Sequence, residues 1–203
     1  MYVDFRNITS YGITPHGVIH VGMHTAEEYP VYKECGVKHI VYIEANKQLA
    51  NKYAPNDPDC FTIHAAVSDK FETVEFNVSN NLASSSILEL GDHSVVYPGI
   101  VFTEKVEMIT STLDKILSDI DLNISLLNVL TLDIQGAELK AMKGLSNWDY
   151  IEAVYTEVNY REMYIGCPLV NEIDLFLLEK GLVKVEEVDT GCGWGDALYV
   201  KKV

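Results

Sequence analysis

The feature that most constrains the fold is a strand, turn, helix and strand pattern near the start of the chain. An apolar strand is predicted over residues 18–22, a helix over 25–35 and a second strand over 38–44, which ends in Glu44. In α/β proteins this order places backbone N–H groups and a carboxylate around one crevice, where a nucleotide-like ligand can bind through its ribose hydroxyls. We therefore expect a ligand site at the ends of these strands.

Strand and helix patterns alternate along the rest of the chain, which favours a largely parallel sheet covered on both faces. A short turn around residues 191–195 joins the last two predicted strands, so we expect an antiparallel strand at the sheet edge. The fold class is therefore α/β and Rossmann-like, with a mostly parallel seven-stranded sheet and helices on both faces. Further strands are predicted at residues 61–67, 72–78, 104–109, 126–132, 150–158, 182–188 and 197–203, and further helices at 46–53, 112–120, 136–144 and 171–180.

Length and composition limit the organisation. With 203 residues, 48% of them hydrophobic, the chain is expected to form one domain over residues 1–203. Residues 1–16 are a predicted N-terminal extension, and 79–103 a predicted loop on the acceptor side. A chain of this size is also open to the interpretation that it is one domain of a larger polypeptide.

The charge and cysteine content exclude several classes. A net charge of −15, from 30 acidic and 15 basic residues, argues against a nucleic-acid partner, because such binding depends on Lys and Arg. Four widely spaced cysteines suggest neither a zinc site nor a disulfide framework. No signal peptide or membrane span is predicted, and we expect a cytoplasmic protein.

Several short motifs resemble the FkbM family of S-adenosylmethionine-dependent methyltransferases. The strongest is LTLDIQGAE at residues 130–138, followed by Gly144. The others, in order, are IHVG at 19–22, YIEAN at 42–46, AAVSD at 65–69, TLD at 112–114, TEVN at 156–159 and GWGDALY at 193–199. The resemblance covers nearly the whole chain from about residue 17, and it implies a class I methyltransferase fold.

The resemblance implies a site for S-adenosylmethionine at the first two strand ends. Glu44 is expected to accept hydrogen bonds from the ribose hydroxyls, and Asp69, beside Ser68, from the adenine amino group. The first loop departs from the usual acid and alternating glycines, because only Gly22 remains, so Glu27, Glu28 or Asp133 is expected to replace the missing acid. The predicted cofactor-binding residues are His20, Gly22, Met23, Glu27, Glu44, Ala45, Ser68, Asp69 and Asp133.

The candidate catalytic residues are Asp133, Glu157, His24 and Glu138. Methyl transfer to an alcohol requires that the hydroxyl be aligned and relieved of its proton, which a carboxylate or a neutral imidazole can accept. Two alternatives stay open. Glu138 suits a helix N-terminus, and His24, Asp133 and Glu157 together suit a divalent cation such as Mg²⁺.

Acceptor recognition is expected from segments that overhang the strand ends. Hydroxyl, amide and aromatic groups together suit a sugar, because an aromatic ring covers the apolar face of a pyranose. The predicted substrate-binding residues are Ser85, Ser86, Asn159, Tyr160, Arg161, Tyr164 and Trp194.

The leading interpretation is an O-methyltransferase that uses S-adenosylmethionine and methylates a hydroxyl of a small-molecule or glycan acceptor. Two alternatives remain. One is a non-catalytic cofactor-binding protein of the same fold. The other is a nicotinamide-dependent oxidoreductase, which is disfavoured because the Gly-x-Gly-x-x-Gly loop is missing.

Overall fold

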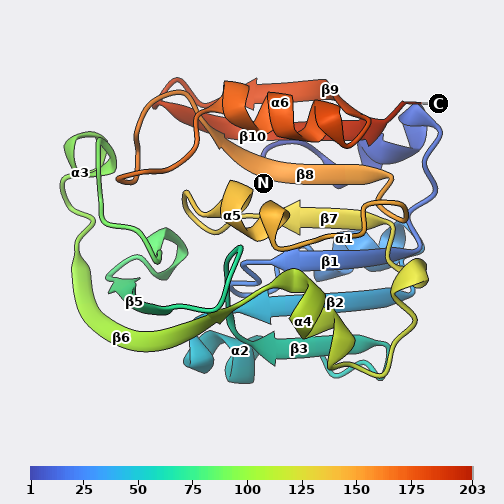
Figure 1. Ribbon diagram of the computed structural model, residues 1–203, viewed down its shortest axis with the longest axis horizontal. Coiled ribbons are helices and arrows are strands. Elements are labelled where there is room, and N and C mark those ends of the chain that lie inside the picture. The colour runs from blue at the N-terminus through green and yellow to red at the C-terminus, as the bar shows by residue number, and fades with distance from the viewer. Residues whose placement is uncertain (203) are drawn as a thin grey trace.

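The computed structural model describes residues 1–202, and its main feature is a seven-stranded sheet (Figure 1). The strands lie in the order β3-β2-β1-β7-β8-β10-β9, and β10 runs antiparallel to both of its neighbours. Numbered within this sheet, the order is 3-2-1-4-5-7-6, so its first five strands follow the doubly wound arrangement. The strands are β1 (Gly17–Val21), β2 (His39–Glu44), β3 (Cys60–His64), β7 (Val129–Leu132), β8 (Ala153–Asn159), β9 (Leu182–Asp189) and β10 (Trp194–Lys201).

The predicted Rossmann-like α/β fold is confirmed. Strands β1, β7 and β8 are buried along their whole length, which explains their nearly continuous apolar sequences. The antiparallel strand β10 lies one place in from the edge, between β8 and β9, rather than at the edge itself.

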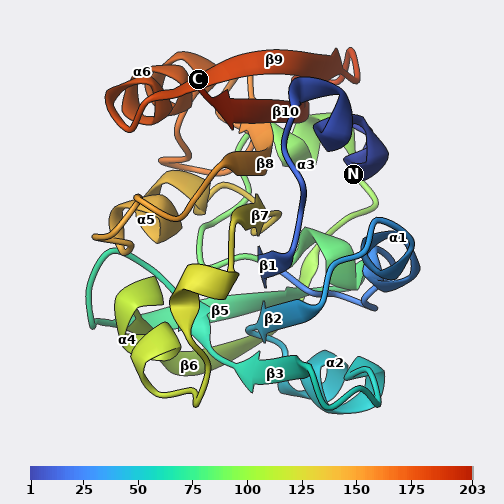
Figure 2. The same cartoon turned by 90° about the vertical axis from the view of Figure 1, so that its right-hand side faces the viewer.

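Helices cover both faces of the sheet (Figure 2). One face packs against α4 (Leu113–Ser118), α5 (Glu138–Lys143) and α6 (Val170–Glu179), through residues such as Leu117, Met142 and Leu177. The other face packs against the 3-10 helix η1 (Phe5–Tyr11) and α1 (Tyr29–Glu34), through Ile8 and Tyr32. Helix α2 (Lys47–Tyr53) lies on the same side as α1. A third 3-10 helix, η3 (Ile124–Leu126), precedes β7.

A second, three-stranded sheet lies beyond the carboxyl ends of the parallel strands (Figure 1). It consists of β4 (Ala66–Val67), β5 (Thr73–Ser79) and β6 (Phe102–Ser111), with β6 in the middle. The strand predicted over residues 61–67 therefore divides, because its last residues pair with β6 instead of β2. The segment between β5 and β6 contains η2 (Leu82–Ser84) and α3 (His93–Val96).

One predicted helix start is wrong. The helix expected from residue 25 begins at Tyr29, because His24 and Ala26 adopt left-handed backbone angles, with φ of 49° and 55°. The helix expected over residues 171–180 is α6, which begins at Val170; there the Glu172 side chain accepts a hydrogen bond from the backbone N–H of Leu169 (2.9 Å).

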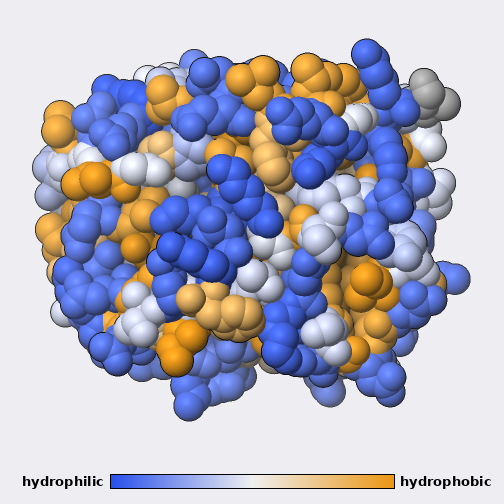
Figure 3. All heavy atoms as spheres, viewed as in Figure 1, coloured by the Kyte–Doolittle hydropathy of each residue, from blue (hydrophilic) through white to orange (hydrophobic). Residues whose placement is uncertain are grey.

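Hydrophilic residues cover most of the face shown in Figure 3, and hydrophobic residues lie among them in small groups. Within residues 1–202, no helix is long and apolar enough to cross a membrane.

Candidate active site

Two cavities meet at the carboxyl ends of β1, β2, β7 and β8, and they share Asp133 and Gln135. This position is the topological switch point of the sheet, because the chain leaves β1 toward β2 on one side and returns at β7 on the other. We call the cavity that contains Glu44 the cofactor cleft and the cavity that contains Glu157 the acceptor cavity, after the roles that the sequence predicts for their residues.

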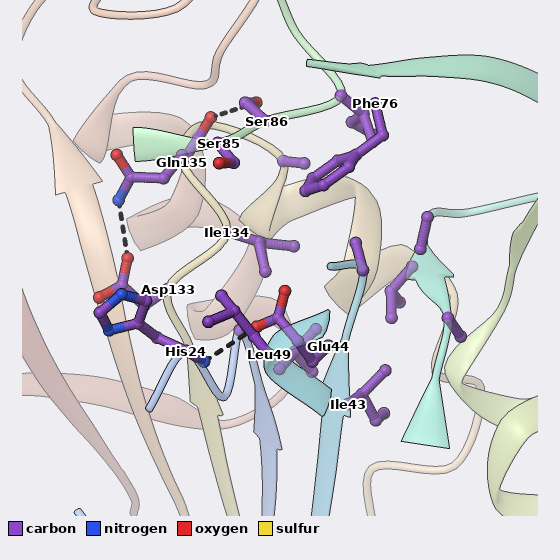
Figure 4. A pocket seen from close by; sticks show the side chains of 18 of the residues that line it. His24, Ile43, Glu44, Leu49, Phe76, Ser85, Ser86, Asp133, Ile134 and Gln135 are labelled. Carbon is purple, nitrogen blue, oxygen red and sulfur yellow. Dashed lines mark hydrogen bonds between the residues drawn. The ribbon is translucent and has the colours of Figure 1, made fainter. Parts of the chain in front are cut away.

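The cofactor cleft has an empty volume of about 560 Å³, part of which is open to solvent. Its walls are mostly apolar and include Ile43, Leu49, Phe76 and Ile134, while Glu44 supplies a carboxylate (Figure 4). No Lys or Arg is among its lining residues. A cleft of this kind suits a ligand with a flat apolar ring and hydroxyl groups, and it does not suit a phosphate.

Glu44 is fixed by two backbone hydrogen bonds. Its Oε1 accepts from the N–H of Asn46 (2.7 Å), and its Oε2 accepts from the N–H of His24 (2.9 Å). Burial raises the pKa of Glu44 above its usual value, although both hydrogen bonds oppose that rise. Since a carboxylate has further acceptor capacity, Glu44 can still bind ligand hydroxyls.

Gly22 has a structural role in addition to the cofactor-binding role expected for it. A Cβ at this position would lie 1.9 Å from the carbonyl oxygen of Asp133, and its φ is +92°. The glycine is therefore required because β1 and β7 approach each other closely at their ends, and not only because a ligand passes nearby. Gly22 and Ala45 both line the cofactor cleft, as predicted.

The acceptor cavity has an empty volume of about 870 Å³, part of which is open to solvent. Three carboxylates reach it, from Asp133, Glu157 and Asp196, and no Lys or Arg lines it. Most of the other lining residues are aromatic or polar, and four are apolar: Met1, Ala83, Ile100 and Met163. The aromatic and polar residues are Tyr2, Asn81, Ser84, His93, Tyr97, Gln135, Asn159, Tyr164 and Trp194.

Gln135 connects the carboxylates of this cavity. Its Nε2 donates to Asp133 Oδ1 and to Glu157 Oε2, both at 2.8 Å, and its Oε1 accepts from the Tyr164 hydroxyl at 2.7 Å. Its backbone is left-handed, with φ of 55°, just before Gly136. The glutamine therefore holds two acids side by side at the boundary between the cleft and the cavity.

These acids have raised pKa values. Burial raises the pKa of Asp133 above its usual value, and the hydrogen bond from Gln135 opposes it. Burial, together with repulsion from Asp133, Glu138 and Asp196, raises the pKa of Glu157 well above the usual range. Burial also raises the pKa of Asp196 to about 6. A carboxyl with a raised pKa is a stronger base once it is ionised.

Glu138 lines neither of the two cavities, and its position is structural. Its Oε1 accepts from the N–H groups of Ile134 (3.0 Å) and Gly136 (3.1 Å), so it closes the turn between β7 and α5. Its Oε2 is buried without a hydrogen-bond partner. Burial raises the pKa of Glu138 to about 7.

Several predicted cofactor residues lie outside the cleft. His20 is buried on the opposite face of the sheet, where its Nδ1 lies 3.0 Å from the Tyr32 hydroxyl, and Met23 is buried in the same core. His20 points away because successive side chains of a strand alternate between faces, whereas Met23 lies in the loop after β1 and packs into the core of that face. Glu27 is exposed beside another cavity under the N-terminal segment. Ser68 and Asp69 contact each other, with the Ser68 hydroxyl donating to Asp69 Oδ1 (3.1 Å), and neither lines the cleft.

The predicted acceptor residues divide in a similar way. Asn159, Tyr164 and Trp194 line the acceptor cavity. Ser85 and Ser86 line the cofactor cleft instead, where the Ser86 hydroxyl donates to the Gln135 carbonyl (2.8 Å).

Two further acceptor candidates line neither cavity. The Tyr160 hydroxyl donates to Glu187 Oε1 (2.7 Å), and Arg161 donates to the Cys192 carbonyl (3.1 Å). His24, a candidate base, lines the cofactor cleft and not the acceptor cavity.

Several residues of the acceptor cavity were not predicted as site residues, among them Gln135, Asp196, His93 and Tyr97. Gln135 follows Asp133 by two residues within the LTLDIQGAE motif, so its position beside a predicted catalytic acid was a usable signal. Asp196 reaches the cavity only because β10 inserts next to β8.

No group of three or more His, Cys, Asp or Glu side chains among residues 1–202 is arranged to hold a metal ion. The combination of His24, Asp133 and Glu157 is therefore not a metal site in this structure.

Comparison with known protein families identifies the chain. The model of the methyltransferase FkbM domain matches residues 20–183. This span includes every residue that lines the cofactor cleft. It also includes the lining of the acceptor cavity, except for the residues from the N-terminal segment and from β10. The chain belongs to the FkbM methyltransferase family. It is an S-adenosylmethionine-dependent methyltransferase, and the apolar cleft with its single strand-end glutamate fits that cofactor.

Solved structures also resemble this methyltransferase. TrmK of M. capricolum in complex with S-adenosyl-homocysteine is 11% identical, with a TM-score of 0.49, and the match covers 100% of this chain and 70% of that one. Magnesium protoporphyrin IX methyltransferase of Synechocystis PCC 6803 with bound SAM is 10% identical, with a TM-score of 0.49, covering 96% and 74%. No curated protein sequence matches the chain.

Proposed function

We propose that this methyltransferase transfers the methyl group to a hydroxyl oxygen of a small polar acceptor, most favourably a sugar or glycan. The observation that carries the proposal is the acid pair Asp133 and Glu157, held by Gln135 at the junction of the two cavities. A hydroxyl that enters the acceptor cavity there has a carboxylate to accept its proton.

The cofactor cleft supports a particular orientation of the donor. Glu44 suits the two ribose hydroxyls, since a carboxylate can accept from both. Leu49, Phe76 and Ile134 supply apolar surface for the adenine ring, and Asp133 lies on the side of the acceptor cavity. We assign the methionine end of the cofactor to that side.

The same cleft argues against the nicotinamide alternative. A dinucleotide carries a pyrophosphate, which binding sites usually cradle with glycine-rich backbone or basic groups. This cleft has two carboxylates, Glu44 and Asp133, and no Lys or Arg. Negative charge at the pyrophosphate position would be repelled.

S-adenosylmethionine supplies a methyl group bonded to a positively charged sulfur. The neutral thioether that remains after transfer, S-adenosylhomocysteine, is a good leaving group. With that cofactor bound, the acceptor oxygen would form the new C–O bond as the C–S bond breaks, and the electrons of the C–S bond would stay on the sulfur. Glu157 accepts the hydroxyl proton, and Gln135 holds this carboxylate in place through Nε2. The raised pKa of Glu157 brings its basicity closer to that of the group it must deprotonate.

The walls of the acceptor cavity suit a sugar. Trp194 and Tyr97 are joined by a hydrogen bond from the indole N–H to the phenol oxygen (3.1 Å), so they form one aromatic wall. Asn159 lies in the same cavity and can bond the polar edge of the ring.

Two measurements test this proposal. S-adenosylhomocysteine should raise the thermal unfolding temperature and NAD should not, because a ligand that binds only the native state stabilises it. Transfer from methyl-labelled S-adenosylmethionine to a panel of monosaccharides and glycans should then give an O-methyl product. Binding of the cofactor without transfer to any acceptor would favour the non-catalytic alternative.

The matched variant is Glu157→Gln, which keeps the shape and removes the base. It should bind S-adenosylhomocysteine like the wild type, because Glu157 does not line the cofactor cleft, and lose about 10²-fold or more in turnover. Turnover close to that of the wild type would refute the assignment of Glu157 as the base.

A further inference from the structure

Strands β8 and β10 place two acids directly opposite each other. Glu157 and Asp196 are register partners in this antiparallel pair, and only 4% and 2% of their surfaces are exposed. Register partners lie about 4.5–5.5 Å apart at Cβ, and like charges there repel each other. A buried pair of this kind is unfavourable unless one carboxyl keeps its proton or a positive group is bound between or beside the two.

The chain supplies little positive charge to this pair. No Lys or Arg lines the acceptor cavity, and burial lowers the pKa of His93, which favours its neutral form. The Met1 amino group, which lines the cavity, is the nearby positive group: burial lowers its pKa, but Asp196, Glu28 and Asp133 together raise it overall, and it lies 3.7 Å from Glu28. Asp196 accepts a hydrogen bond from the backbone N–H of Tyr2. Within residues 1–202, the three carboxylates that line this cavity therefore face a single amino group, which also lies beside a fourth acid, Glu28, so an excess of negative charge remains.

A second observation points to a ligand at the same place. Asn159, two residues after Glu157 on the same face of β8, is fully buried, and both its amide oxygen and its amide nitrogen lack a hydrogen-bond partner. The Nδ1 atom of His93 is also buried without a partner. Both residues line the acceptor cavity. Buried polar atoms are almost always paired in native proteins, so these atoms indicate a missing polar ligand.

We propose that the acceptor carries a protonated amine on a carbon next to the methylated hydroxyl, as in an amino sugar or another vicinal amino alcohol. The ammonium group binds Asp196, and the Asn159 amide oxygen completes its hydrogen bonds. The neighbouring hydroxyl then faces Glu157, which accepts its proton when the methyl group is transferred to oxygen. This inference rests on the proposed function and specifies its substrate class.

The arrangement accounts for features that a neutral sugar leaves unexplained. An ammonium group offsets the repulsion between Glu157 and Asp196, and it donates to an amide oxygen that otherwise has no partner. Tyr97, Tyr164 and Trp194 line the same cavity, and aromatic faces also attract cations. Charge-assisted hydrogen bonds in a site with little water are stronger than neutral ones.

The test compares three probes by calorimetric titration near neutral pH with S-adenosylhomocysteine present. Glucosamine carries the charge, glucose replaces the amine with a hydroxyl, and N-acetylglucosamine removes the charge but keeps the nitrogen. We expect glucosamine to bind about tenfold more tightly than either neutral probe, a ratio typical of one charge-assisted hydrogen bond.

Two variants separate the charge from the fold. Asp196→Asn keeps an oxygen that can accept from the Tyr2 N–H, and it should reduce the preference for glucosamine to within about twofold. Asp119→Asn, at the exposed end of α4, removes the same charge outside the cavity and should keep the preference.

The outcomes are distinguishable from a failure of the proposed function. Equal or weaker binding of glucosamine, or no detectable binding of it, overturns the inference, as does a preference that survives in Asp196→Asn. A product methylated on nitrogen also overturns it, because the amine would then be the reacting group. Methylation of neutral sugar hydroxyls without preference leaves the proposed function intact, whereas no cofactor binding and no transfer would contradict that function itself.

Discussion

Replacement of Glu138 by Gln should change how stability depends on pH. The carboxyl is fully buried, and its Oε2 has no hydrogen-bond partner, while its Oε1 closes the turn after β7. Gln keeps an oxygen at the Oε1 position and cannot ionise. The comparison of Glu138→Gln with the wild type therefore isolates the cost of a single buried charge.

The sign follows from the raised pKa. Burial moves the pKa of Glu138 from 4.5 to about 7, so the native state keeps its proton to a higher pH than the unfolded state. The stability associated with this group is fully present below about pH 4.5 and decreases as the pH rises toward 7. A difference of about 2.5 in pKa corresponds to about 3 kcal/mol. Relative to the wild type, Glu138→Gln should therefore gain about 3 kcal/mol between about pH 4.5 and pH 8.

The assay is urea unfolding followed by tryptophan fluorescence at several pH values, with the free energy of unfolding compared at each pH. Glu179→Gln, on the exposed side of α6, is the control for loss of one negative charge at the surface. A difference between Glu138→Gln and the wild type that stays constant with pH would refute the argument, since it would mean that Glu138 ionises alike in both states.

Three other substitutions test separate parts of the structure. Gly22→Ala should destabilise the protein by at least about 3 kcal/mol in urea unfolding, because the added Cβ would overlap a backbone oxygen. Gly36→Ala, where φ is +82° and a Cβ would meet open space, should cost only about 1 kcal/mol. Equal costs for the two variants would contradict the close approach of β1 and β7 at Gly22. Glu44→Gln should weaken the binding of S-adenosylhomocysteine at least about tenfold in calorimetry, because the charge-assisted hydrogen bonds to the ribose are lost. Glu27→Gln, outside the cofactor cleft, should leave that affinity unchanged. Unchanged affinity in Glu44→Gln would show that Glu44 does not bind the ribose. Gln135→Leu should slow turnover and move the acidic limb of the pH–rate profile to higher pH. The reason is that the variant loses the hydrogen bonds that lower the pKa values of Asp133 and Glu157. A reduced rate with an unchanged pH–rate profile would indicate a merely structural role for Gln135.

The strands of the main sheet could be predicted because each is short, apolar and bounded by turn residues. The same local reasoning failed at residues 25–28. His24 and Ala26 adopt left-handed angles there, which local sequence rarely signals in residues other than glycine, and Pro30 instead fits the first turn of a later helix.

Individual site residues were predicted less well than the strand ends that carry them. Asp133, Glu157 and Glu44 reach the two cavities because each lies at or just beyond the carboxyl end of a parallel strand. His20 lies near the end of β1, but the alternation of side chains directs it to the opposite face, and Met23, in the loop beyond β1, packs into the core of that face.

Long-range partners were the least accessible to sequence reasoning. The pairing of Asp196 with Glu157 depends on the insertion of β10 between β8 and β9, which no local pattern specifies. Gln135 was visible within a motif, but its three hydrogen bonds depend on residues up to 29 positions away.

A crystal structure with S-adenosylhomocysteine tests the central claim most directly. We predict that its ribose hydroxyls lie within hydrogen-bond distance of Glu44 and that its sulfur faces the cavity that contains Glu157. A ligand bound elsewhere, or one whose sulfur points away from Glu157, would contradict the account.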